Sequence, residues 1–427
     1  MARERQTKGS HQPDFLIKDK QKRDRNTRRK QANILLHICR AISEAGAPAH
    51  RLESYMQVIS DKFELSASFF AMPTAVLASI GEDEYSQRSY MIKTNPNDIN
   101  LNTLHTINEV INDLENDAID IDSALNAIKE ITNKPAEYPN WLFALSFGLV
   151  GGGFTTLFSG SWSDVIAASV LGLISGIITI YSTPFKYLSQ LLAPLTAMIV
   201  GFTAITISHY WQTIDHFLVS LAGLIILVPG LGITVAMREL STGHLVSGSS
   251  RMAGAVTTLF LLSFGLALGY LIAQSIYGET TVHKFDGVPA WFNYLALVIT
   301  ALCFTVLFKA RFADTFWIFL SIGLAFAGSN LIGLWMAQPF KSLVAVMLVS
   351  IAGNIYSRIS SNPASVMHIP GIILLVPGSI GFNSLSAMYT NDTMTGVQAA
   401  FNAVLIAVAI SVGLLVGNLI VPPKKDL

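Results

Sequence analysis

After Pro139, long apolar runs alternate with short polar breaks, whereas residues 1–135 change between polar and apolar positions every few residues. A helix needs roughly 20 mostly apolar residues to cross a bilayer. Reading between the polar breaks predicts ten spans, over residues 141–158, 165–181, 187–207, 217–237, 252–276, 291–308, 316–336, 343–356, 366–382 and 397–421. The second and eighth of these are short. Tryptophans near several predicted ends fit the preference of indoles for the membrane interface.

The polar front of the chain predicts a small folded domain. Residues 32–45 carry apolar side chains at helical period, Gly46 and Pro48 interrupt the pattern, and a second helix is expected up to Leu65. Two extended stretches around residues 67–81 and 85–94 follow, and then two more helices. We expect a basic, disordered tail over 1–30 and an α+β domain over 31–138.

Composition agrees with this division. The chain is 51% hydrophobic and 13% charged, while soluble proteins carry about a quarter charged residues. Residues 1–30 hold 11 basic and 4 acidic residues, and residues 31–135 hold 7 and 15. The first 30 residues contain no apolar core of a cleavable signal peptide, so the front is expected to stay in the cytoplasm.

Placing the N-terminus inside puts eight basic residues on the cytoplasmic side, and only Lys284 and Lys341 outside. This bias supports ten spans with both termini in the cytoplasm of a multi-pass protein of the cell membrane.

An internal repeat divides the membrane part. "AGLIILVPG" at 222–230 recurs as "PGIILLVPG" at 370–378, in the fourth and ninth predicted spans. Five spans therefore form one unit, and the two units cover residues 139–276 and 289–421. An odd number of crossings inverts the second unit, as in many secondary transporters. The predicted fold class is a mostly α membrane protein with two inverted five-helix repeats after a small cytosolic α+β domain.

The repeated Val-Pro-Gly predicts a pair of broken helices. Pro229 and Pro377 each remove a backbone donor, and Gly230 and Gly378 permit a sharp break. Opened backbone is tolerated in a membrane only against protein or water. A lone break would be read as a harmless kink, but two related copies favour a central substrate site.

Few polar side chains remain to complete such a site. The candidates are Asn354, Asn383, Asn402 and Ser249, each of which is more often a helix–helix hydrogen bond than a ligand. Candidates for coupling or gating are His368, Arg251 and Arg358, whose alternative is anchoring at the interface.

The soluble domain lacks a nucleophile elbow, a Walker loop, a dinucleotide glycine pattern or a metal-spaced His/Cys set. We therefore expect no enzyme, metal or cofactor, although a hydrolase using His50 or Ser43 stays an alternative. No nucleic-acid partner is expected, and homo-oligomerisation is left open. The partners expected are a small-molecule substrate and the lipid bilayer.

The order of parts resembles the threonine/serine exporter family, which includes fungal pheromone-regulated membrane proteins. The resemblance covers residues 32–421 and is carried by "EAGAPAHRLE", which contains His50, Arg51 and Glu53, and by the paired "LVPG". Some relatives look like this chain cut into two subunits. The resemblance implies export of small hydroxylated amino acids driven by an ion gradient, while the split relatives point to dicarboxylate export as the alternative.

Scarce buried charge fits a zwitterionic amino acid better than a dianion. A dicarboxylate carrier would require Arg251 or Arg358 to point inward. A scaffold without transport is a third class, but an inverted repeat is not needed for an anchor.

Overall fold

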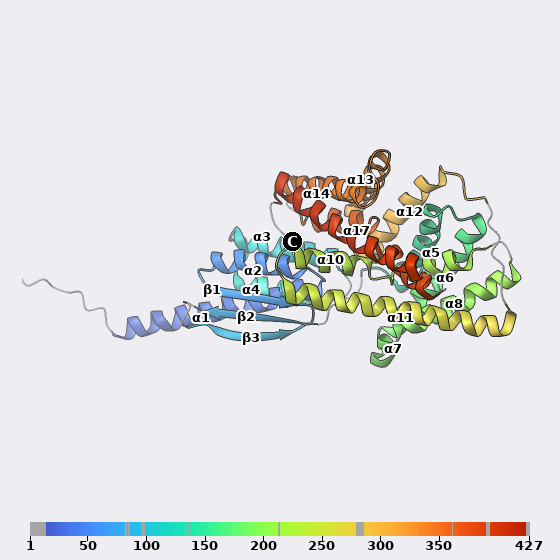
Figure 1. Ribbon diagram of the computed structural model, residues 1–427. Helices are drawn as coiled ribbons and strands as arrows, with labels where there is room; N and C mark the ends of the chain where they lie inside the picture. The colour runs from blue at the N-terminus through green and yellow to red at the C-terminus, as the bar shows by residue number, and fades with distance from the viewer. Residues whose placement is uncertain are drawn as a thin grey trace, which may run out of the picture.

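The computed structural model describes residues 14–81, 83, 86–94, 99–134, 137–211, 214–278, 286–360, 362–389 and 393–423, with the side chains from Thr27 onward apart from those of Asn383 and residues 385–393. The chain forms a small domain with a three-stranded sheet at one end and an assembly of helices at the other (Figure 1).

The small domain consists of helices α1 (Asp14–Glu44), α2 (Ala49–Lys62), α3 (Leu101–Glu115) and α4 (Ile121–Asn133) with strands β1 (Ser66–Met72), β2 (Ala75–Gly81) and β3 (Arg88–Lys93). The strands form an antiparallel sheet in the order β1-β2-β3. Its core joins the apolar faces of α1, α2, α3 and α4 to one face of the sheet. The predicted α+β arrangement is thus present.

The basic segment differs from the prediction of a disordered tail. Helix α1 begins at Asp14, so residues 14–30 are helical, and residues 1–13 lie outside the described part. The physical reason is local: from Asp14 to Glu44 the sequence has no glycine or proline, and its Lys, Arg and Gln residues are good helix formers.

The apolar part begins with α5 (Asn140–Leu157), α6 (Trp162–Ser182), α7 (Lys186–Gln190), α8 (Leu192–Tyr210), α9 (His216–Leu224), α10 (Gly230–Ser241) and α11 (Leu245–Tyr277). It continues with α12 (Phe292–Leu307), the 3₁₀ turn η1 (Phe312–Asp314), α13 (Thr315–Gly333), α14 (Phe340–Ser360), α15 (Ser365–Ile373), α16 (Gly378–Tyr389) and α17 (Thr393–Ile420). Each of the ten predicted spans coincides with one helix or with a pair of shorter ones.

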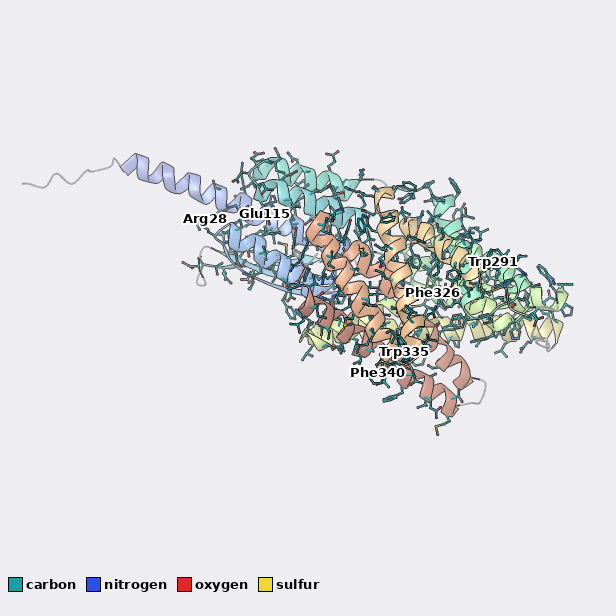
Figure 2. The ribbon with its side chains drawn as sticks, turned by 90° about the horizontal axis from the view of Figure 1, so that it is seen from above. Arg28, Glu115, Trp291, Phe326, Trp335 and Phe340 are labelled. Atoms are coloured by element: carbon teal, nitrogen blue, oxygen red, sulfur yellow. The ribbon has the colours of Figure 1, made fainter. Side chains whose placement is uncertain are left out.

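Seven helical segments of the described chain are long and apolar enough to cross a membrane: residues 162–182, 192–210, 245–277, 312–333, 340–360, 365–382 and 394–420. Helix α12 is apolar but shorter. Exposed aromatic side chains stand at several helix ends, such as Trp291 before α12, and Trp335 and Phe340 at the turn from α13 to α14 (Figure 2).

Helix packing follows the same plan twice. In the first set α5 packs on α6, α6 on α9, α8 on α9 and on α11, and α10 on α11. In the second set α12 packs on α13, α13 on α15, α14 on α15 and on α17, and α16 on α17. Between the sets α5 contacts α12, while α10 contacts α17 and α11 contacts α16. The contacts between the sets are therefore reciprocal.

Candidate functional site

Both Val-Pro-Gly motifs interrupt a helix. Helix α9 ends at Leu224 and α10 begins at Gly230, with Pro229 as the residue that precedes the new helix. Likewise α15 ends at Ile373 and α16 begins at Gly378. Proline cannot donate to the preceding turn, so each helix stops before it and restarts at the glycine.

The two breaks touch each other. A Cβ atom built on Gly230 would lie 3.1 Å from the Cα of Gly378 and 2.3 Å from Cγ1 of Val376. A Cβ atom on Gly378 would lie 3.0 Å from the Cα of Gly230 and from Cγ1 of Val228. The 2.3 Å approach would force Val376 to shift, and contacts of 3.0–3.1 Å are tighter than ordinary packing, so both positions favour glycine. The backbone is thus packed tightly where the breaks cross.

Two small cavities lie on one side of this crossing. One, of about 50 Å³, is enclosed by α10, α15, Leu414 of α17 and the segment of the small domain that leads into α2. The other, of about 120 Å³, lies between the small domain, α10 and Arg251 of α11. Neither is lined by Pro229, Gly230, Pro377 or Gly378, so their role in substrate binding stays a prediction.

The "AHRLE" segment at the start of α2 docks onto the broken helices. The backbone N–H of Ala49 donates to Oε1 of Glu239 at the end of α10, at 2.9 Å. Arg51 Nη2 lies 3.0 Å from Nδ1 of His368 in α15. Glu53 Oε2 lies 3.1 Å from Nε2 of His244, before α11. This segment therefore contacts α10 and α15, the two half-helices that flank the breaks.

Glu239 is the centre of this junction. Its carboxylate is fully buried and accepts hydrogen bonds from the hydroxyl of Ser247 at 2.9 Å and from Nε of Arg251 at 3.2 Å, besides that from Ala49. A buried carboxylate is tolerated only when it is paired and hydrogen-bonded, and both conditions hold here.

His50 is buried in the same junction, and neither of its ring nitrogens has a hydrogen-bond partner among the described residues. Burial, and then the charges of Arg238, Arg51, His244 and Arg251, lowers the pKa of His50 to about 2. The imidazole is neutral at physiological pH, and it forms no pair with Ser43. The base and nucleophile of a hydrolase are therefore not assembled by these two residues.

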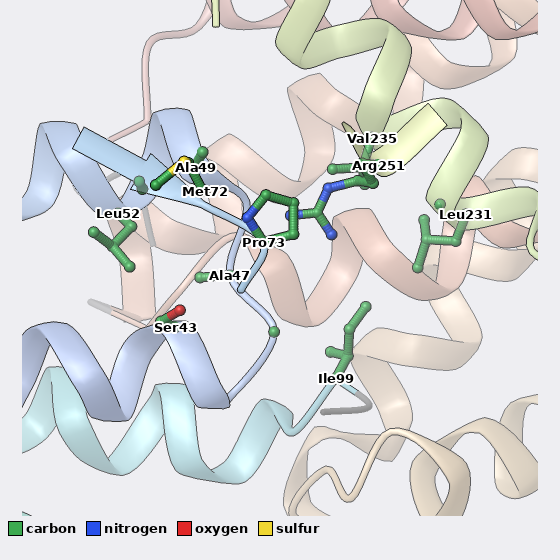
Figure 3. A pocket seen from close by; sticks show the side chains of 13 residues that line it. Ser43, Ala47, Ala49, Leu52, Met72, Pro73, Ile99, Leu231, Val235 and Arg251 are labelled. Carbon is green, nitrogen blue, oxygen red and sulfur yellow. The ribbon is translucent and has the colours of Figure 1, made fainter. Parts of the chain in front are cut away.

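Arg251 and Arg358, whose positions were expected to separate an amino-acid carrier from a dicarboxylate carrier, lie in different places. The Arg251 guanidinium enters the larger cavity beside Pro73, across from Ser43 and Ile99 (Figure 3). Arg358 is exposed, and its Nε donates to the carbonyl oxygen of Pro422 near the C-terminus. Arg251 thus points inward, but its charge is matched by Glu239.

The other predicted polar residues do not gather at the breaks. Asn354 is buried and donates to Oδ1 of Asn418 at 2.8 Å and to the carbonyl oxygen of Val421, which ties α14 to α17. Asn402 and Ser249 are exposed on α17 and α11. The side chain of Asn383 lies outside the described part.

The sequence did not identify Arg238 or Glu239 as site residues, whereas it gave His368 as a candidate for coupling or gating. All three are buried, with Arg238 6% exposed, Glu239 0% and His368 2%. The available signal was the adjacency of Arg238 and Glu239 on a helix that follows a break. Within the described residues no three His, Cys, Asp or Glu side chains come together as a metal site would require.

Comparison with known proteins gives a consistent result. The sequence model ThrE, described as a threonine/serine exporter, matches residues 33–273, and the model ThrE_2, "Threonine/Serine exporter, ThrE", matches residues 293–420. No solved structure matches the chain.

The chain is also similar to fungal proteins named pheromone-regulated membrane protein 10. Identity is 26% over 420 residues for that of Eremothecium gossypii, covering 91% of this chain and 56% of the relative. For that of Candida albicans it is 27% over 421 residues, covering 91% and 38%. The chain thus spans about half or less of the length of these relatives.

Proposed function

Because this chain belongs to the threonine/serine exporter family, a family of membrane transporters, we propose that it exports small amino acids of the threonine/serine type by alternating access around its paired broken helices. We place it in the cytoplasmic membrane with both termini in the cytoplasm. In this proposal it is a secondary transporter.

The observation that carries this proposal is the contact between the two breaks. Gly230 and Gly378 come from the repeated Val-Pro-Gly motifs of the two sets of helices, and their backbones meet without a side chain between them. Helices broken near the middle of the bilayer, at the interface of inverted repeats, are the usual substrate site of secondary transporters.

The reciprocal helix contacts support an inverted ten-span repeat. A twofold axis through the crossing would exchange α10 with α16 and α11 with α17, and the pairs α10–α17 and α11–α16 are both in contact. Two sets related in this way can exchange conformations, which is the basis of alternating access.

The test is counterflow in liposomes that contain the full chain, with labelled threonine, serine and succinate. The wild type should accumulate labelled threonine or serine. The double variant Pro229→Ala/Pro377→Ala should keep its melting temperature and lose uptake. Pro370→Ala removes a proline inside α15, away from the break, and should retain uptake. Uptake that survives in the double variant would remove the breaks from the transport path.

A dicarboxylate exporter is the second candidate, and one observation favours it. The cavity between α10 and α15 is lined by Arg51 and Arg238, and its lining includes no Asp or Glu. Net positive charge suits an anion better than a zwitterion. Counterflow with labelled succinate in the same liposomes separates the two candidates.

A further inference from the structure

The smaller cavity is enclosed by matching faces of the two broken helices. From α10 it is lined by Leu231, Thr234, Val235 and Arg238, and from α15 by Ser365, His368, Ile369 and Ile372. Both sets have the spacing i, i+3, i+4 and i+7, which places each on one side of its helix. The cavity therefore runs along the two half-helices away from the crossing of the breaks.

The polar groups of this cavity favour a carboxylate. Arg51 and Arg238 are 4% and 6% exposed. The hydroxyl of Ser365 is also buried and has no hydrogen-bond partner among the described residues. Two guanidiniums and an unused hydroxyl donor, in a lining that otherwise holds Thr234, His368 and apolar side chains, match the needs of a buried carboxylate.

The contact between Arg51 and His368 can be replaced. A guanidinium only donates, so Nδ1 of His368 must accept from Nη2 of Arg51, and Nε2 of His368 then donates to the carbonyl oxygen of Ser350 at 3.2 Å. A carboxylate accepts from a guanidinium more strongly than a neutral imidazole does, and it can accept in a bidentate manner. An incoming carboxylate would therefore compete well for Arg51.

Access to the cavity is controlled by the small domain. Gly46, Ala47, Pro48 and Arg51 form the wall that the small domain contributes. The cavity of about 50 Å³ lies between this segment and the two half-helices, so movement of the segment away from α10 and α15 would widen it for the substrate.

We propose that Arg51 of the small domain and Arg238 of α10 bind the carboxylate of the substrate at the cytoplasmic end of the transport path, so that the small domain is the inner gate. This inference rests on the proposed transport function and adds to it a binding residue outside the membrane helices. Substrate binding exchanges the Arg51–His368 contact for an Arg51–carboxylate contact.

The test uses a cysteine in the cavity wall as a reporter. Thr234→Cys is made in the full chain with Cys39 and Cys303, both buried, replaced by alanine. The rate of labelling by a soluble maleimide is then measured with and without threonine, succinate, or the amino alcohol of threonine, which lacks the carboxylate. Ile369→Cys on the opposite wall serves as a second reporter if the first variant misfolds.

We expect threonine or succinate, but not the amino alcohol, to slow labelling. Arg51→Gln and Arg238→Gln should raise the concentration for half-protection about 10- to 100-fold, as expected for the loss of a charged hydrogen bond, and Arg51→Lys should raise it less. Arg88→Gln, at an exposed position on β3, is the matched control and should behave as wild type.

Equal protection in Arg51→Gln and wild type, equal protection by the amino alcohol, or no protection by either carboxylate would overturn the proposal. Labelling needs no transport. Protection that depends on Arg51 without counterflow would therefore refute the transport function alone, and counterflow with protection independent of Arg51 would refute the gate alone.

Discussion

The contact between the breaks leads to a prediction about two glycines of α10, Gly230 and Gly232. Substitution of Gly230 by alanine places a Cβ atom 2.3 Å from Cγ1 of Val376 and 3.1 Å from the Cα of Gly378. Carbon atoms pack best at about 3.5–4.0 Å, so Val376 or the backbone must shift. Such overpacking costs about 1–3 kcal/mol.

Gly232 provides the matched control on the same helix. An alanine Cβ there would meet its nearest neighbour, Cβ of Ala255, at 3.8 Å, which is ordinary contact. The substitution should stabilise α10 by about 0.5–1 kcal/mol because glycine is a poor helix former. The two variants should thus differ in free energy of unfolding by about 1.5–4 kcal/mol.

The assay is thermal unfolding in detergent, with counterflow measured in parallel. Val376→Ala should restore part of the stability of Gly230→Ala, because it removes the atom at 2.3 Å and leaves only the approach to Gly378. Equal stability of Gly230→Ala and Gly232→Ala, or no coupling between positions 230 and 376, would refute the crossing of the breaks.

Three further predictions concern the junction. The lowered pKa of His50 means that the unfolded or undocked chain takes up the proton first, so stability falls as pH drops below about 6.5, by about 1 kcal/mol at pH 5.5. His50→Gln should flatten this loss in melting curves between pH 7.5 and 5.5; a slope equal to that of wild type would contradict it. Glu239→Gln leaves the partly exposed Arg251 without its charged partner and should cost about 1.5–3 kcal/mol, seen as faster labelling of a cysteine at position 234, and an unchanged rate would argue against docking through Glu239. Arg358→Gln should alter stability by less than about 0.5 kcal/mol because the side chain is exposed, and a loss of counterflow would restore Arg358 as a coupling residue.

The positions of the helices could be predicted because their causes are local. Apolar runs give the spans, and proline followed by glycine gives the interruptions before Gly230 and Gly378. The ten-span count stays a prediction, since length and apolarity support seven spans in the described part.

The candidate site could be predicted only in pieces. His50, Arg51 and Glu53 were identified as a motif, but Arg51 and Glu53 contact His368 and His244, which lie 317 and 191 residues away along the chain. No local pattern reports such a pairing. A charge near the end of a span is equally consistent with the lipid interface, so the sequence alone does not show that the small domain covers Glu239.

The small domain also holds the membrane part at a second place, the turn after α12. There the first backbone N–H groups of α3, those of Leu101 and Asn102, donate to the carbonyl oxygens of Phe308 and Lys309 at 2.9 and 3.1 Å. The start of one helix is thus joined to the end of another. If α2 separates from α10 and α15 while these two hydrogen bonds hold, the small domain rotates about the turn after α12. Opening of the cavity beside α10 would then also displace the second set of helices.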